Sequence, residues 1–140
     1  MSLFASPSGS TPSRLRALAP IAYCAALYVL SAVPGALDQQ NSLEHALAGL
    51  FPPLVQNLLH LPLFAGLAWC CSWALRGWDL SPATRLSVAL ILTLSYAAID
   101  EWHQSYVPDR SASQIDFVLD ALGAALGALL AFAAEIRKKA

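Results

Sequence analysis

Five consecutive residues, Asp100-Glu101-Trp102-His103-Gln104, place two carboxylates, an imidazole and an amide directly after a long apolar run. On an α-helix of about 100° per residue, Asp100, His103 and Gln104 share one face, with Glu101 at its edge and Trp102 pointing away. Carboxylates and imidazoles are the usual general acids and bases of enzymes. Contact with lipid is costly for such groups, so this face should turn toward a protein interior or a wet cavity.

Further polar residues are expected at the same depth. His60 lies near the start of a second apolar run, and Asp116 and Asp120 lie near the start of another. Arg110 is the expected counter-charge for Glu101 or Asp116, and it could equally bind an anionic headgroup. Carboxylates with histidine suit a divalent cation in principle, but the chain has no established metal spacing. We therefore predict no metal site, and the sequence leaves the cofactor open.

The composition is that of an integral membrane protein of one domain. The chain has 140 residues, of which 57% are hydrophobic and 12% are charged, whereas soluble domains carry about 25% charged residues. The mean hydropathy is +0.55. The net charge of −1 gives no case for binding nucleic acid. Cys24, Cys70 and Cys71 lie inside apolar runs and are interpreted as small buried hydrophobes.

Four apolar segments are candidate membrane spans, because each comes close to the length of about 20 residues that a bilayer requires. They cover approximately residues 15–33, 54–75, 83–99 and 115–134. The lipid bilayer is thus the first predicted partner. The predicted fold is all-α: a polytopic membrane protein with a bundle of four transmembrane helices.

A shorter helix is predicted between the first two spans. Within Ser42–Phe51, apolar residues recur at helical spacing and form one face. We interpret this segment as a short helix lying in the membrane interface, with an irregular loop as the alternative. Residues 1–13 are rich in Ser, Pro and Gly and are predicted to form a disordered tail. Residues 14–136 then form the membrane domain, and residues 137–140 form a basic C-terminus.

The basic residues predict the orientation, because cytoplasmic loops carry an excess of Lys and Arg. Seven of the eight basic residues fall on one predicted side, namely Arg14, Arg16, Arg76, Arg85, Arg137, Lys138 and Lys139. Only Arg110 falls on the other side. Both termini are therefore predicted to be cytoplasmic in a bacterial plasma membrane, with residues 34–53 and 100–115 outside.

The last span carries a stripe of small and acidic residues. Asp116, Asp120, Gly123 and Gly127 fall within a narrow arc of the helix. Two glycines four residues apart let another helix approach closely, so this stripe predicts a helix-packing face with both aspartates pointing inward. The alternative is that small residues are merely frequent in this alanine-rich chain.

These motifs together resemble the VanZ-like family of small bacterial membrane proteins. The resemblance covers about half the chain and rests on the order and spacing of His60-x-x-x-Phe64, Asp100-Glu101-x-His103-Gln104-x-x-Val107-Pro108-x-Arg110, Asp116 and Gly123-x-x-x-Gly127. It implies a protein with several membrane spans. The best-known member of the family is linked to low-level teicoplanin resistance.

The chain departs from the family pattern at three places. Gln56-Asn57 stands where the family usually has Asp-Lys, Asp109 where it has glycine, and Asp120 where it has asparagine. The first departure puts in doubt any role that needs a lysine near His60.

Three functional hypotheses follow. The first is a membrane enzyme of the cell envelope that acts on a lipid or lipid-linked cell-wall precursor at the outer leaflet, with catalytic residues His60, Asp100, Glu101 and His103, and substrate-binding residues Gln104, Arg110, Asp116 and Asp120. The second is a non-catalytic protein that binds an amphiphile, such as a glycopeptide antibiotic, or a partner protein, with a structural polar cluster. A transporter is the weakest hypothesis, because no charged residue is predicted at the membrane midplane. Whether the protein is an enzyme or a homo-oligomer is left open.

Overall fold

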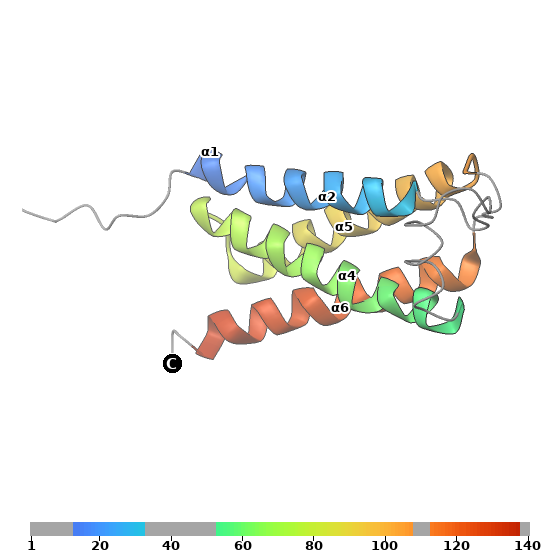
Figure 1. The fold of residues 1–140 in the computed structure, drawn as a ribbon. Helices are drawn as coiled ribbons and strands as arrows, with labels where there is room; N and C mark the ends of the chain where they lie inside the picture. The colour runs from blue at the N-terminus through green and yellow to red at the C-terminus, as the bar shows by residue number, and fades with distance from the viewer. Residues whose placement is uncertain (1–12, 33–52, 108–112, 138–140) are drawn as a thin grey trace, which may run out of the picture.

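The computed structural model describes residues 13–32, 53–107 and 113–137, and every regular element in these ranges is a helix. Figure 1 shows them as a bundle of elongated helices. The elements are α1 (Ser13–Arg16), α2 (Leu18–Ser31), α4 (Pro53–Ala74), the short 3-10 helix η1 (Leu75–Gly77), α5 (Pro82–Gln104) and α6 (Gln114–Arg137). The predicted interfacial helix at Ser42–Phe51 and the predicted counter-charge Arg110 lie outside the described residues.

Three helices are long and apolar enough to cross a membrane: Asn57–Gly77, Pro82–Gln104 and Gln114–Arg137. The fourth apolar helix, α2, has 14 residues, which corresponds to a length of about 21 Å, less than the roughly 30 Å of a hydrocarbon core. A turn at Ala17 separates it from α1. The protein is thus an all-helical membrane protein, while the count of four spans stays a prediction.

Capping serines define where two of the long helices begin. Ser81 Oγ accepts a hydrogen bond from the backbone N–H of Thr84 at 3.1 Å, and Pro82 occupies the first helical position, where its missing N–H costs nothing. Ser113 Oγ likewise accepts from the backbone N–H of Asp116 at 3.3 Å at the start of α6. At its other end α5 continues to Gln104, beyond the limit of the apolar run near Ile99, so the polar segment belongs to the helix.

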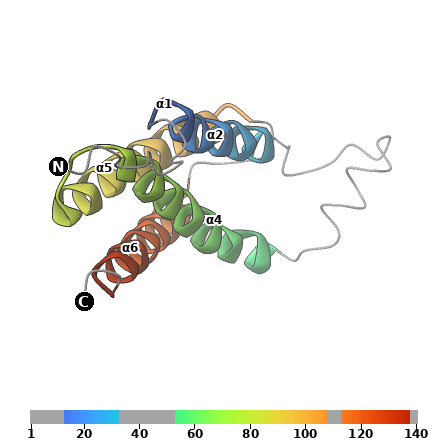
Figure 2. The same cartoon turned by 90° about the vertical axis from the view of Figure 1, so that its left-hand side faces the viewer.

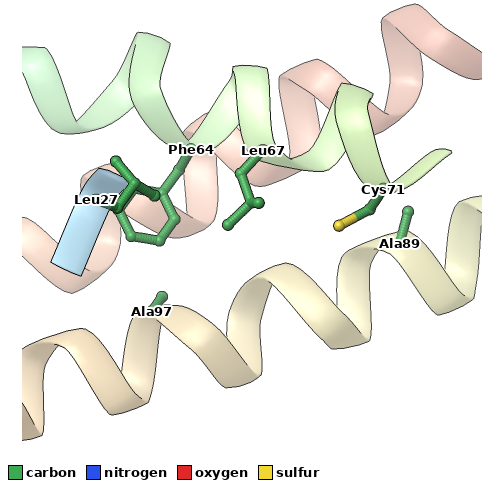
Figure 3. Close-up of a cluster of buried hydrophobic side chains, with 6 residues drawn as sticks. All are labelled: Leu27, Phe64, Leu67, Cys71, Ala89 and Ala97. Carbon is green, nitrogen blue, oxygen red and sulfur yellow. The ribbon is translucent and has the colours of Figure 1, made fainter. Parts of the chain in front are cut away.

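The core is organised around α4, which contacts every other described helix and lies between α2 and α6 in Figure 2. A row of side chains on α4 faces α5, as Figure 3 shows, where small residues leave room for them. The cluster comprises Leu27 of α2, Phe64, Leu67 and Cys71 of α4, and Ala89 and Ala97 of α5. Large side chains on α4 thus pack into the space that alanines on α5 leave free.

The closest helix contact joins α4 and α6, which run side by side in the same direction (Figure 1). A Cβ atom added to Gly123 would collide with the backbone carbonyl of Leu61, and one added to Gly127 would collide with that of Ala65. Gly123 and Gly127 are four residues apart on α6, and Leu61 and Ala65 are four residues apart on α4. The two glycines therefore pack against successive turns of α4. The helices therefore touch backbone to backbone, the close packing that a small-xxx-small stripe allows.

Tyrosine hydroxyls attach α2 to its neighbours. Tyr23 donates a hydrogen bond to the carbonyl of Leu63 at 3.0 Å, and Tyr96 of α5 donates to the carbonyl of Cys24 at 2.7 Å. The Tyr23 hydroxyl reaches the backbone of α4 because Gly66 has no side chain in its path. Inside a membrane, such hydrogen bonds hold helices together where hydrophobic burial cannot.

Candidate functional site at one end of the bundle

The central pair of the candidate site joins His60 of α4 to Asp120 of α6. His60 Nδ1 lies 2.9 Å from Asp120 Oδ1. The ring of Phe64 stacks parallel to the imidazole, with centroids 6.2 Å apart. The contact between Gly123 and Leu61 explains this pairing. His60 directly precedes Leu61, and Asp120 lies about one helical turn before Gly123, so the two side chains lie at the same level.

The last turn of α5 contributes three buried polar side chains, those of Asp100, Glu101 and Gln104. Gln104 Nε2 donates a hydrogen bond to Asp100 Oδ2 at 2.8 Å. Glu101 Oε2 accepts a hydrogen bond from the backbone N–H of Ser113 at 2.7 Å. Glu101 thus ties the end of α5 to the residue that caps α6.

Five titratable residues form what we call the acid cluster: His60, Asp100, Glu101, Asp116 and Asp120. They share one electrostatic environment, since His60 interacts with Asp100, Asp116 and Asp120, and Glu101 interacts with His60, Asp116 and Asp120. Their elements meet where α4 and α6 begin and α5 ends, at the right-hand end of Figure 1.

The hydrogen bonding of the acid cluster is incomplete. Each of its four carboxyl groups keeps one buried oxygen with no hydrogen-bond partner among the described residues, namely Asp100 Oδ1, Glu101 Oε1, Asp116 Oδ1 and Asp120 Oδ2. Buried charge without compensation is costly. The acid cluster therefore has unused capacity for protons, for a cationic group or for a ligand that donates hydrogen bonds.

His103 lies outside the acid cluster, although the helix wheel placed it with Asp100 and Gln104. Its Nδ1 lies 3.4 Å from Ser31 Oγ, and its ring centroid lies 4.2 Å from that of Tyr28. Both partners belong to α2. The wheel gives relative directions only, and the neighbouring helices decide which arc is buried: α6 covers the side of Glu101, and α2 covers the side of His103.

Among the described residues, no group of three or more His, Cys, Asp or Glu side chains is placed to hold a metal ion. The described cysteines Cys24, Cys70 and Cys71 are free thiols.

The sequence did not predict the residues that bind Glu101 and His103. Ser113 both caps α6 and binds Glu101. Ser113-Gln-Ile-Asp116 fits the Ser-x-x-acid signature of a helix start, so a search for capping motifs before each apolar run would have found it. Tyr28 and Ser31, the partners of His103, carry no comparable signal, because a tyrosine or serine inside an apolar helix is not distinctive.

The arrangement is suited to acid–base chemistry at His60. A carboxylate at Nδ1 fixes the orientation of the ring and favours a proton on that nitrogen, which leaves Nε2 as the acceptor. The His60 side chain is 16% exposed while that of Asp120 is fully buried, so the imidazole is the member of the pair that an outside molecule can reach. Such a molecule would meet the imidazole of His60 and not the carboxyl group of Asp120.

The chain was compared with known protein families, curated proteins and solved structures. The family model described as VanZ/LLP1 matches residues 3–135, nearly the whole chain. No curated protein and no solved structure shows significant similarity to the chain.

Proposed function

This chain belongs to the VanZ/LLP1 family, and from that premise we propose that it is a cell-envelope protein whose acid cluster binds the polar headgroup of a lipid or lipid-linked cell-wall precursor. We further propose that His60 performs acid–base chemistry on that headgroup, with Asp120 positioning the imidazole. Asp100 and Glu101 are proposed to accept hydrogen bonds from the bound molecule. The site is proposed to face the outer leaflet of a bacterial plasma membrane.

The observation that carries this proposal is the combination of a His–Asp pair at 2.9 Å with four buried carboxyl oxygens for which the described ranges supply no hydrogen-bond partner. A cluster that served only to hold helices together would gain stability by satisfying those oxygens internally. Unsatisfied polar groups are typical of sites that a ligand completes, and histidine near a carboxylate is a frequent acid–base arrangement.

A structural role is the second candidate, and two hydrogen bonds favour it. Gln104 binds Asp100 within α5, and the Ser113 N–H binds Glu101 across the loop from α5 to α6. In this reading the carboxylates fix the ends of helices, and the protein binds an amphiphile or a partner without chemistry.

Mass spectrometry of extracted lipids separates the two candidates. Cells that lack the gene are complemented with wild-type protein, with His60→Gln or with Asp79→Asn; Asp79 is exposed near the start of α5 at the other end of the bundle. If His60 acts as an acid or base, His60→Gln should show the lipid profile of the deletion, and Asp79→Asn should show that of the wild type. A wild-type profile for His60→Gln at equal protein level would contradict the catalytic proposal.

A further inference from the structure

A second polar site lies at the opposite end of the bundle from the acid cluster. It is a small pocket of about 10 Å³ where η1 and the end of α4 meet the start of α5 and the end of α6. The polar residues that line it are Ser72, Arg76, Arg85 and Glu135, and the remaining lining residues are apolar. Figure 1 shows these helix ends at the same end of the molecule as α1.

Three residues that line this pocket have side-chain donors without a partner in the part of the chain that the structure describes. The Ser72 side chain is buried, with the residue 6% exposed, and its Oγ makes no hydrogen bond to a described residue. The same is true of the buried Nε atoms of Arg76 and Arg85. A buried hydroxyl and two guanidinium N–H groups around one small space need an acceptor, because unpaired buried donors are costly.

The charge of the pocket favours an anion. Arg85 forms an ion pair with Glu135, so these two residues compensate each other. Arg76 forms no ion pair with any described residue and leaves one positive charge in excess. Guanidinium groups bind phosphate oxygens through parallel N–H groups, and a hydroxyl can bind a further oxygen.

The size of the pocket limits what enters it. A volume of this size has room for about one water molecule, or for one oxygen of a larger oxyanion. The rest of such an anion would stay at the mouth of the pocket, where helices of a membrane bundle end and lipid headgroups begin. A phosphate group anchored in a bilayer is presented at this depth.

We propose that Ser72, Arg76 and Arg85 form a binding site for the phosphate group of an anionic phospholipid. This site is separate from the acid cluster and does not depend on the function proposed for it. If the basic end faces the cytoplasm, the site meets the leaflet whose surface is negative.

Native mass spectrometry of the full chain in detergent micelles tests the proposal with phosphatidylglycerol as the lipid and inorganic phosphate as a competitor. Arg76→Gln should weaken retention of the lipid about tenfold, because it removes one charge-assisted contact. Ser72→Ala should weaken it about threefold, since a neutral hydrogen bond contributes less. Removal of an unpartnered hydroxyl should leave the fold intact, which makes Ser72→Ala the variant that separates binding from folding.

Arg137→Gln is the matched control, because Arg137 is exposed near the same end and does not line the pocket. It removes the same charge and should leave retention unchanged. Binding of inorganic phosphate without retention of lipid would support the same phosphate chemistry with free phosphate as the source. Equal retention by wild type, Arg76→Gln and Ser72→Ala would overturn the proposal and leave the pocket as a site for water only.

Discussion

At the scale of single residues, His60 and Asp120 should be energetically coupled, because their hydrogen bond is largely buried. Asp120→Ala leaves the imidazole without its partner and should lower the free energy of unfolding by about 3 kcal/mol. The double variant with His60→Ala should cost less than the sum of the two single variants. Unfolding in mixed detergent micelles measures the free energy of unfolding of the two single variants and of the double variant.

Asp79→Ala is the control, because Asp79 is exposed and its substitution should change the free energy of unfolding by less than about 0.5 kcal/mol. Purely additive effects of the His60 and Asp120 substitutions would show that the pair contributes nothing to stability.

Glu101→Gln separates charge from shape. The amide oxygen of glutamine can still accept the hydrogen bond from the Ser113 N–H, so the melting temperature in detergent should stay close to that of the wild type. The lipid profile of cells should nevertheless change if the negative charge takes part in binding or catalysis. If melting temperature and lipid profile both match the wild type, the charge of Glu101 is dispensable and its role is structural.

The residues of the acid cluster were predictable from the sequence, but the side chains that they contact were not. The resemblance and the helix wheel selected His60, Asp100, Glu101, Asp116 and Asp120, and the structure brings these residues into one cluster. The pairing of His60 with Asp120 depends on the register between two helices, which no pattern within one helix contains. The placement of His103 against α2 depends on the helix order around α5 in the same way.

At the scale of helices, the contact between α4 and α6 should tolerate no large side chain. Gly127→Leu would drive a side chain into the backbone of Ala65, so we expect severe loss of thermal stability or of folded protein. Leu129→Ala, on an exposed face of the same helix, should matter much less. Equal melting temperatures of the two variants in detergent would contradict the packing described here.

Substitution of the closely packed glycines by alanine should lower thermal stability by different amounts. An added methyl group at Gly66 meets the far end of the Tyr23 side chain, which can rotate away at the expense of one hydrogen bond. At Gly123 the same methyl group meets backbone, which cannot move without its helix. Gly66→Ala should therefore cost about 1 kcal/mol and Gly123→Ala clearly more. Thermal unfolding of both variants measures the order, and the reverse order would count against a backbone contact at Gly123.

Helix positions followed from the sequence more closely than helix ends. Apolar runs of sufficient length predicted α4, α5 and α6, because lipid-facing and core-facing residues are both apolar. The end of α5 was harder to place, since the polar residues after Ile99 are buried by α6 and remain helical. The first span was predicted as one segment, whereas the structure has a turn at Ala17. Pro20 explains this break, because it has no backbone N–H to donate to the carbonyl of Arg16, where α1 ends.

At the scale of the whole molecule, the orientation in the membrane can be tested directly. Figure 1 places α1, the connection between α4 and α5, and the end of α6 at one end of the bundle, and this end carries most of the basic residues. A reporter that is active only in the cytoplasm, fused after Lys139, should therefore be active. An insertion of the same reporter within residues 34–53 should be inactive. Activity in the reverse pattern would place the acid cluster on the cytoplasmic side.

The backbone contact between α4 and α6 also decides which of the helices around the acid cluster can move. His60 and Asp120 sit on two helices that meet through glycines, and such a contact cannot be widened slightly without being lost. α5 instead packs on α4 and α6 through side chains such as those of Leu86, Leu90 and Leu94, which can slide and repack. Entry of a lipid headgroup should then proceed by outward tilting of the end of α5, with the other two helices as a fixed frame. Hydrogen exchange should be faster in the last turns of α5 than in the facing turns of α4 and α6, and uniform exchange across the three helices would exclude such a gate.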